Sequence, residues 1–107
     1  MTIPMNQQIF NEIQTLKRQL IPNEKLILFG SQARGDARED SDWDLLVLLE
    51  KEGESFSENY QKYGYPFAEL GFKYCTHINA IIYTVRDWEA HPSIFRYNIE
   101  HEGIEIK

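Results

Sequence analysis

Two acidic residues, Asp42 and Asp44, flank Trp43 and lead into the apolar run LLVLL. Residues two apart in a strand project to the same face, so a strand that begins at Asp42 places both carboxylates side by side and turns Trp43 away. Two neighbouring carboxylates repel each other unless a cation lies between them. We therefore predict that the pair binds a hard divalent cation, Mg²⁺ or Mn²⁺. The alternative is a pair of solvated carboxylates at the mouth of the strand.

A glycine and a serine, Gly30 and Ser31, follow an earlier apolar run, LILF. A Gly-Ser turn before a short helix presents free backbone N–H groups and the positive end of the helix dipole, which suits a phosphate. The hydroxyl of Ser31 is expected to contact the phosphate, and a plain N-cap is the alternative. Arg34 is predicted either to bind phosphate oxygens or to form a salt bridge with Asp40 or Asp42. A phosphate site beside metal-binding carboxylates is typical of phosphoryl transfer.

Hydrophobic periodicity indicates the elements that must position these residues. A first helical stripe precedes the LILF run and consists of Ile9, Phe10, Ile13, Leu16 and Leu20. A second helical stripe follows the acidic motif and consists of Tyr60, Tyr63, Phe67, Leu70 and Tyr74. Pro66 falls inside the second stripe, so we predict that this helix is kinked or restarted there.

Strands are predicted between and after these helices, over residues 25–30, 42–50 and 76–84. The second strand is long and apolar enough to be central, with both faces covered. A short helix is predicted over 31–34, and two more near the end of the chain, one opened by Asp87 and one over 93–101. Gly103 is expected to end the last helix, before a short strand or tail. The predicted fold class is α/β, a small mixed β-sheet with helices packed against it, in one domain over 1–107.

The composition narrows the classes of ligand and compartment. A net charge of −6 makes free nucleic acid an unfavourable ligand, because phosphate backbones require a basic face. The single cysteine, Cys75, rules out an internal disulfide and is expected to be a buried structural thiol. No apolar run reaches membrane-spanning length and no signal-peptide pattern opens the chain, so we expect the cytoplasm and no membrane.

The motif residues resemble the minimal nucleotidyltransferases of the DNA polymerase beta-like superfamily. The matching residues lie within 27–49 and are Gly30, Ser31, Ala33, Arg34, Gly35, Ser41, Asp42, Asp44 and Leu45. The resemblance implies a nucleotidyltransferase-like fold and transfer of a nucleoside monophosphate, AMP, from a nucleoside triphosphate, ATP, to a hydroxyl on a macromolecular acceptor. It implies that Asp42 and Asp44 are the catalytic metal ligands, with Gly30, Ser31 and Arg34 on the triphosphate.

The same resemblance implies a partner and a third acid. Such domains often act as antitoxins, paired with a helical toxin of the HEPN type. The family carries a third carboxylate on the third strand, where this sequence has Asn79. An amide carries no charge and cannot act as a general base, which puts catalysis in doubt. His77 would share the face of Asn79 in a regular strand and would assist as base or ligand, whereas a satisfied structural histidine is the favoured interpretation.

Two classes of function therefore stay open. The first is a metal-dependent nucleotidyltransferase, favoured because the acidic pair is electrostatically costly and has no evident structural use. The second is a catalytically weak or inactive module that binds a nucleotide or a protein partner, favoured by Asn79.

Overall fold

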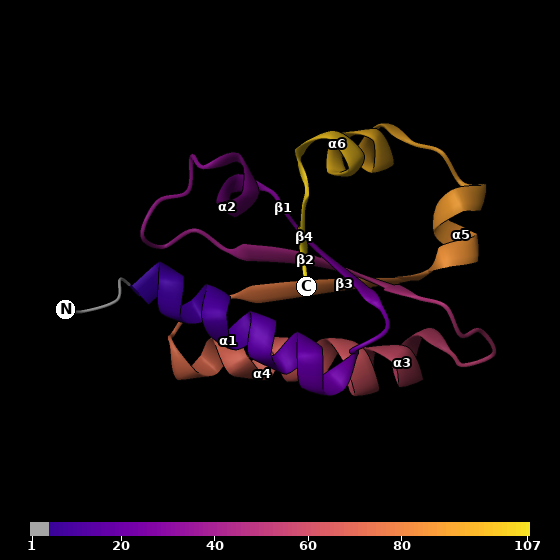
Figure 1. Cartoon of the computed structure of the whole chain (residues 1–107), viewed down its shortest axis with the longest axis horizontal. Coiled ribbons are helices and arrows are strands. Elements are labelled where there is room, and N and C mark those ends of the chain that lie inside the picture. The colour runs from indigo at the N-terminus through magenta and orange to yellow at the C-terminus, as the bar shows by residue number, and fades with distance from the viewer. Residues whose placement is uncertain (1–4) are drawn as a thin grey trace.

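A mixed four-stranded sheet forms the centre of the protein, for which the computed structural model describes residues 5–107 (Figure 1). In spatial order the strands are β3 (Ile78–Thr84), β2 (Trp43–Leu49), β1 (Lys25–Phe29) and β4 (Ile104–Ile106). Strand β1 runs antiparallel to both β2 and β4, while β2 and β3 are parallel. The predicted α/β class and mixed sheet are confirmed, and 104–106 is a strand rather than a tail.

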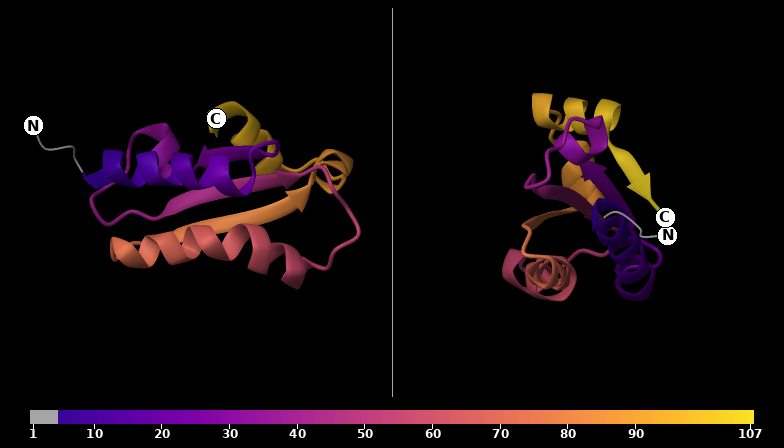
Figure 2. Two further views of the ribbon diagram at one scale, coloured as in Figure 1. Left: turned by 60° about the horizontal axis from the view of Figure 1, so that its bottom comes forward. Right: turned by 90° about the vertical axis from the view of Figure 1, so that its left-hand side faces the viewer.

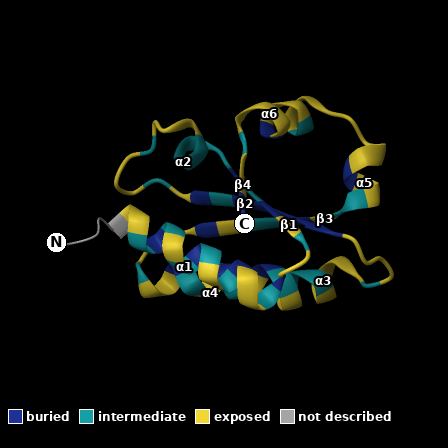
Figure 3. Cartoon of the chain, in the orientation of Figure 1, coloured by how far each residue is buried: buried dark blue, intermediate teal, exposed yellow. Residues whose placement is uncertain are grey.

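Helices cover both faces of this sheet (Figure 2). Two helices pack on one face, α1 (Met5–Leu20) and α4 (Tyr65–Lys73). Two others pack on the opposite face, α5 (Val85–Ala90) and α6 (Ile94–Glu102). Every residue of β2 from Leu45 to Leu49 is buried, because alternate side chains enter opposite cores (Figure 3). The predicted central position of this strand is confirmed.

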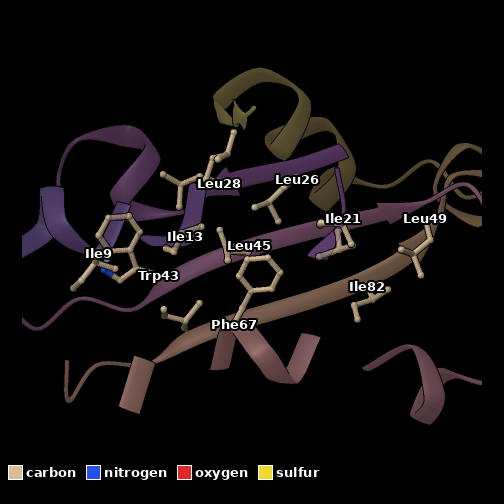
Figure 4. Close-up of a cluster of buried hydrophobic side chains, with 13 residues drawn as sticks. Ile9, Ile13, Ile21, Leu26, Leu28, Trp43, Leu45, Leu49, Phe67 and Ile82 are labelled. Carbon is tan, nitrogen blue, oxygen red and sulfur yellow. The ribbon is translucent and has the colours of Figure 1, made fainter. Parts of the chain in front are cut away.

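The larger core lies between the sheet and the pair α1 and α4 (Figure 4). Ile13 of α1, Leu45 of β2 and Phe67 of α4 are fully buried there. The smaller core on the opposite face joins Leu46 of β2 to Trp88 of α5, together with Leu48 and Ile99. Burial of this apolar surface is the main favourable contribution to folding.

The helical segment between β2 and β3 is irregular, as predicted, but Pro66 is not the only cause. It comprises α3 (Phe56–Asn59), a π-helical turn over Tyr60–Gly64 and then α4. Pro66 lies in the first turn of α4, where a missing N–H is tolerated. The irregularity thus begins before Pro66, at a glycine that packs closely: a Cβ on Gly64 would lie only 2.7 Å from the Tyr60 ring and 3.0 Å from Ile82 of β3.

Four predicted strand boundaries are corrected. The first strand ends at Phe29 instead of residue 30, and the second ends at Leu49 instead of residue 50. The second strand begins at Trp43 instead of residue 42, and the third begins at Ile78 instead of residue 76. The remaining short helix, α2 (Ser31–Arg34), has the predicted bounds. Among residues 5–107, no helix combines the length and apolar character needed to span a bilayer.

Candidate active site

The ends of three strands bring the acidic motif together with the Gly-Ser turn. Because β1 is antiparallel to β2, Phe29 at the end of β1 lies opposite Asp44 at the beginning of β2. Because β3 is parallel to β2, Asn79 near the beginning of β3 also lies opposite Asp44, on the other side. Gly30 follows Phe29 directly, so the turn, the acidic residues and Asn79 meet at one end of the sheet.

Asn79 bridges the two aspartates through its side-chain amide. Its Nδ2 lies 3.2 Å from Asp44 Oδ1 and 3.4 Å from Asp42 Oδ2. Trp43, between the two acids, is buried in the core beneath α1 and α4, whereas the even-numbered neighbour Leu46 enters the opposite core. The predicted alternation therefore holds, even though Asp42 precedes the strand. The residue aligned with the family's third acid does lie beside the pair.

Gly30 is held against Asp44 by the path of the backbone. Its φ of 76° is a conformation that residues with a side chain rarely adopt. A Cβ at this position would overlap Asp44 Oδ2. A glycine at this position therefore lets the backbone approach the Asp44 carboxylate closely.

Ser31 is the first residue of α2 and does not cap it. Gly30 occupies the N-cap position, and no side chain forms a capping hydrogen bond there. The capping alternative for Ser31 is therefore wrong. The first backbone hydrogen bonds of α2 run from Ala33 N and Arg34 N to Gly30 O. Within the described part of the chain, the N–H groups of Ser31 and Gln32 donate to no backbone carbonyl, as is usual for the first residues of a helix. Gly35 ends the helix in the left-handed conformation.

Arg34 forms ion pairs with partners that the sequence did not indicate. Its Nε lies 3.3 Å from Asp36 Oδ2, and its Nη1 lies 3.5 Å from Glu102 Oε2 at the end of α6. The predicted alternatives, Asp40 and Asp42, are not its partners. Its hydrogen bond to Asp36 and the charge of that carboxylate raise the pKa of Arg34, so the guanidinium stays charged. The side chain is 45% exposed and remains accessible to a ligand.

His77 and Cys75 lie in the turn that connects α4 to β3, and both predictions for them are corrected. His77 is exposed rather than a structural histidine, and its Nδ1 lies 3.6 Å from Asp42 Oδ1. Its carbonyl accepts a hydrogen bond from Trp43 N at 2.9 Å, which fixes the turn beside β2. Cys75 is exposed, not buried, and has a φ of 52°. Neither residue is part of the regular strand, so strand periodicity does not describe them.

A match to a protein-family profile identifies the family of this chain. The profile described as "Nucleotidyltransferase domain" matches residues 8–99. The chain belongs to this nucleotidyltransferase family. The match includes the Gly-Ser turn, both aspartates and Asn79.

Solved structures share the fold of this nucleotidyltransferase domain. A toxin–antitoxin crystal structure with AMP-PNP superposes with a TM-score of 0.63 at 19% identity, over 92% of this chain and 72% of that chain. The toxin–antitoxin MntA-HepT superposes with a TM-score of 0.58 at 17% identity, over 94% and 71% of the two chains. At these identities the likeness shows the fold alone. A comparison with curated proteins found no match.

The donor set of this nucleotidyltransferase domain suits one metal ion that keeps other ligands. Among the described residues, no group of three His, Cys, Asp or Glu side chains is placed to hold a metal ion. The site offers two carboxylates, whereas Asn79 presents its amide N–H group, a donor that does not bind a metal ion. Mg²⁺ commonly binds through one or two carboxylates and takes its remaining ligands from water and phosphates. Asp42 and Asp44 therefore fit Mg²⁺ that arrives with a nucleotide.

Proposed function

We propose that the protein is a metal-dependent nucleotidyltransferase that transfers AMP from ATP to a hydroxyl on a macromolecular acceptor. The observation that carries the proposal is the convergence of Asp42 and Asp44 on one amide, directly beside the Gly30 turn. Two carboxylates this close are mutually unfavourable, and the site makes chemical sense when a cation neutralises them.

The chain's own residues would orient the nucleotide for an in-line displacement. Asp42 and Asp44 would hold Mg²⁺ or Mn²⁺, which stabilises charge on the α-phosphate and on the departing pyrophosphate. The acceptor oxygen forms a bond to the α-phosphorus while the bond to the bridging β-phosphate oxygen breaks. Pyrophosphate departs with that electron pair, and the hydroxyl proton passes to solvent. Asn79 would hold both carboxylates in position through its amide, and it cannot take the proton.

The β- and γ-phosphates would lie over the beginning of α2. The N–H groups of Ser31 and Gln32 and the hydroxyl of Ser31 are the donors available there. Arg34 would exchange one of its exposed carboxylate partners for phosphate oxygens, which bind a guanidinium in the same bidentate geometry. Gly30 would keep this turn in contact with Asp44, so that the phosphates and the metal share one site.

A helical toxin of the HEPN type is the acceptor we favour, with both proteins in the cytoplasm. The motif resemblance implies this partner, and the structures that share the fold are toxin–antitoxin complexes, one of them with AMP-PNP.

The second candidate is a module that binds nucleotide and partner without transfer. Asn79 favours it, because the amide leaves the site without a third carboxylate to act as a base. The two candidates share the metal site and the phosphate site. They differ only in whether the bond at the α-phosphorus breaks.

The test uses ATP carrying a label at either the α- or the γ-phosphorus, with Mg²⁺ and the product of a neighbouring gene as acceptor. We expect label on the acceptor only from the α-position, and none with Asp42→Asn. Asp87→Asn, which removes the same charge from the exposed surface of α5, should leave transfer unchanged. Nucleotide binding without transfer would support the module instead, and no binding would exclude both.

A further inference from the structure

A cavity of about 570 Å³ opens beside the acidic pair, within the size range of small-molecule sites. It lies between the first turns of α1, the loop before β2 and the turn before β3. Asp42 forms part of its wall, and so does Gln32, the residue that follows Ser31 in α2. The cavity therefore adjoins the metal site through Asp42 and the phosphate turn through Gln32.

We propose that this cavity receives the nucleoside half of the donor nucleotide, with the base against its apolar side. This inference rests on the proposed function and adds to it the place of the base and ribose. With the α-phosphate at Asp42, the β- and γ-phosphates extend toward Ser31. The nucleoside then extends in the opposite direction, past Asp42 and into the cavity.

The lining of the cavity matches an uncharged heteroaromatic ring. Ile9 and Trp43 lie side by side at one wall, where both belong to the larger core (Figure 4). Tyr74 also lines the cavity and packs against the same core. Asn6 and Gln32 also line the cavity, and carboxamides pair well with the donor and acceptor edge of a purine. Apolar walls with a few polar groups are the usual composition of a small-molecule site.

The charges that line the cavity favour the nucleoside half of the nucleotide over the triphosphate half. Glu39, Asp40 and Asp42 also line the cavity, and Arg38 is the one permanently charged cation among the lining residues that the structure describes. Three carboxylates disfavour a triphosphate but not a neutral nucleoside. The triphosphate is therefore expected over α2, and the cavity is left for the base and ribose.

A second cavity also lies beside the site, and it is smaller than the first. It measures about 230 Å³ and lies along β3, with Phe72, His77 and Asn79 among its lining residues. This volume is below the range of about 300–1,000 Å³ that is usual for small-molecule sites. The larger cavity is therefore the better match for a nucleoside.

Cys75 provides a direct probe, because it is the only cysteine in the chain, is exposed and lines the larger cavity. Binding is followed by thermal shift, and alkylation of Cys75 by N-ethylmaleimide is followed by intact mass. Two ligands are compared at saturation, ATP with Mg²⁺ and inorganic tripolyphosphate with Mg²⁺. We expect both to bind, and only ATP to slow the alkylation severalfold.

A filled cavity gives an independent readout. Ala37→Trp places an indole from the loop into the cavity without changing the core or the acidic pair. We expect about tenfold weaker ATP binding, equivalent to about 1.4 kcal/mol, with tripolyphosphate binding unchanged. Ala90→Trp makes the same substitution at an exposed position of α5 and should change neither ligand. Melting curves of both variants establish that they are folded.

Three results would overturn the inference. ATP that binds without protecting Cys75 places the nucleoside elsewhere. Tripolyphosphate that protects Cys75 as well as ATP does places the phosphates in the cavity. Equal ATP affinity in folded Ala37→Trp contradicts occupation of the cavity. Failure of both ligands to bind the wild type would instead contradict the proposed function itself.

Discussion

At the scale of single residues, the site is defined by two negative charges around one neutral amide. Asn79 donates to both Asp42 and Asp44, which lessens their repulsion when no cation is present. The amide therefore stabilises the site when no metal ion is bound. Because the amide is uncharged, the metal-bound site has one negatively charged ligand fewer than it would have with a carboxylate at this position. Position 79 consequently sets a balance between fold stability and metal affinity.

Asn79→Asp should shift that balance. A third carboxylate at this position replaces two hydrogen bonds by repulsion, so we expect about 0.5–3 kcal/mol of destabilisation without metal. With Mg²⁺ and ATP the loss should shrink, because a ligand that binds the native state stabilises it. Melting curves with and without Mg²⁺-ATP measure both effects, and transfer activity should rise.

The matched control is Asn11→Asp, which adds the same charge to the exposed surface of α1. Its stability should not respond to Mg²⁺-ATP more than the wild type does. A cost of Asn79→Asp that is independent of metal would show that residue 79 has no role in a metal site.

Ser31→Ala separates ligand binding from helix capping. Because the hydroxyl of Ser31 caps nothing, we expect a change in fold stability of less than about 0.5 kcal/mol. Loss of a hydrogen bond to a charged phosphate should weaken ATP binding by roughly 1–3 kcal/mol. Calorimetry with Mg²⁺-ATP, beside thermal denaturation, gives the two values. Unchanged affinity would remove the Ser31 hydroxyl from the phosphate site.

At the scale of elements, β2 supplies residues both to the candidate site and to the two cores. Its first residues carry the acids, and the rest of the strand enters both cores. The position of Asp44 therefore depends on how firmly the strand is held between β1 and β3. Stability and site geometry are coupled through this one strand.

Leu45→Ala tests how strongly β2 is held. Leu45 is fully buried and follows Asp44 directly, so truncation should destabilise the fold by about 2–5 kcal/mol. Ile94→Ala, at an 81% exposed position of α6, should change stability by less than about 0.5 kcal/mol. Urea unfolding of the two variants measures the difference. Similar small losses in both would contradict the burial of β2 described above.

The sequence predicted those elements whose pattern is local. The alternation through β2 and the helical stripe of α1 indicated their type and their buried faces. The π-helical turn did not follow, because its tight packing involves Gly64 and Ile82, a contact between residues distant in the chain. Glu102 was missed as a partner of Arg34 for the same reason, since it approaches only once α6 has packed, whereas the other partner, Asp36, is only two residues away.

The turn before β3 shows another limit of sequence patterns. Hydrophobic periodicity extended the third strand to residue 76, which suggested a structural role for His77 and burial for Cys75. The structure instead ends α4 with a turn in which both side chains are exposed. Periodicity shows which residues face a core, but it does not fix the residue at which a strand begins.

At the scale of the whole molecule, sheet topology assembles the site. The antiparallel pair of β1 and β2 and the parallel pair of β2 and β3 bring the Gly30 turn, Asp44 and Asn79 to one end of the sheet. Helix α2 lies at this end, and α5 lies at the other (Figure 1). The 570 Å³ cavity opens beside the same end, so phosphate, metal and nucleoside sites would be contiguous.

The most direct test is anomalous diffraction from crystals grown with Mn²⁺ and a non-hydrolysable ATP analogue. We predict one anomalous peak between Asp42 and Asp44, at about 2.0–2.3 Å from a carboxylate oxygen of each, with triphosphate oxygens completing its coordination. Asp42→Asn/Asp44→Asn crystals should lack that peak. A bound nucleotide whose Mn²⁺ lies away from both aspartates, or no peak at all beside an ordered triphosphate, would contradict the assignment of this pair as the metal site.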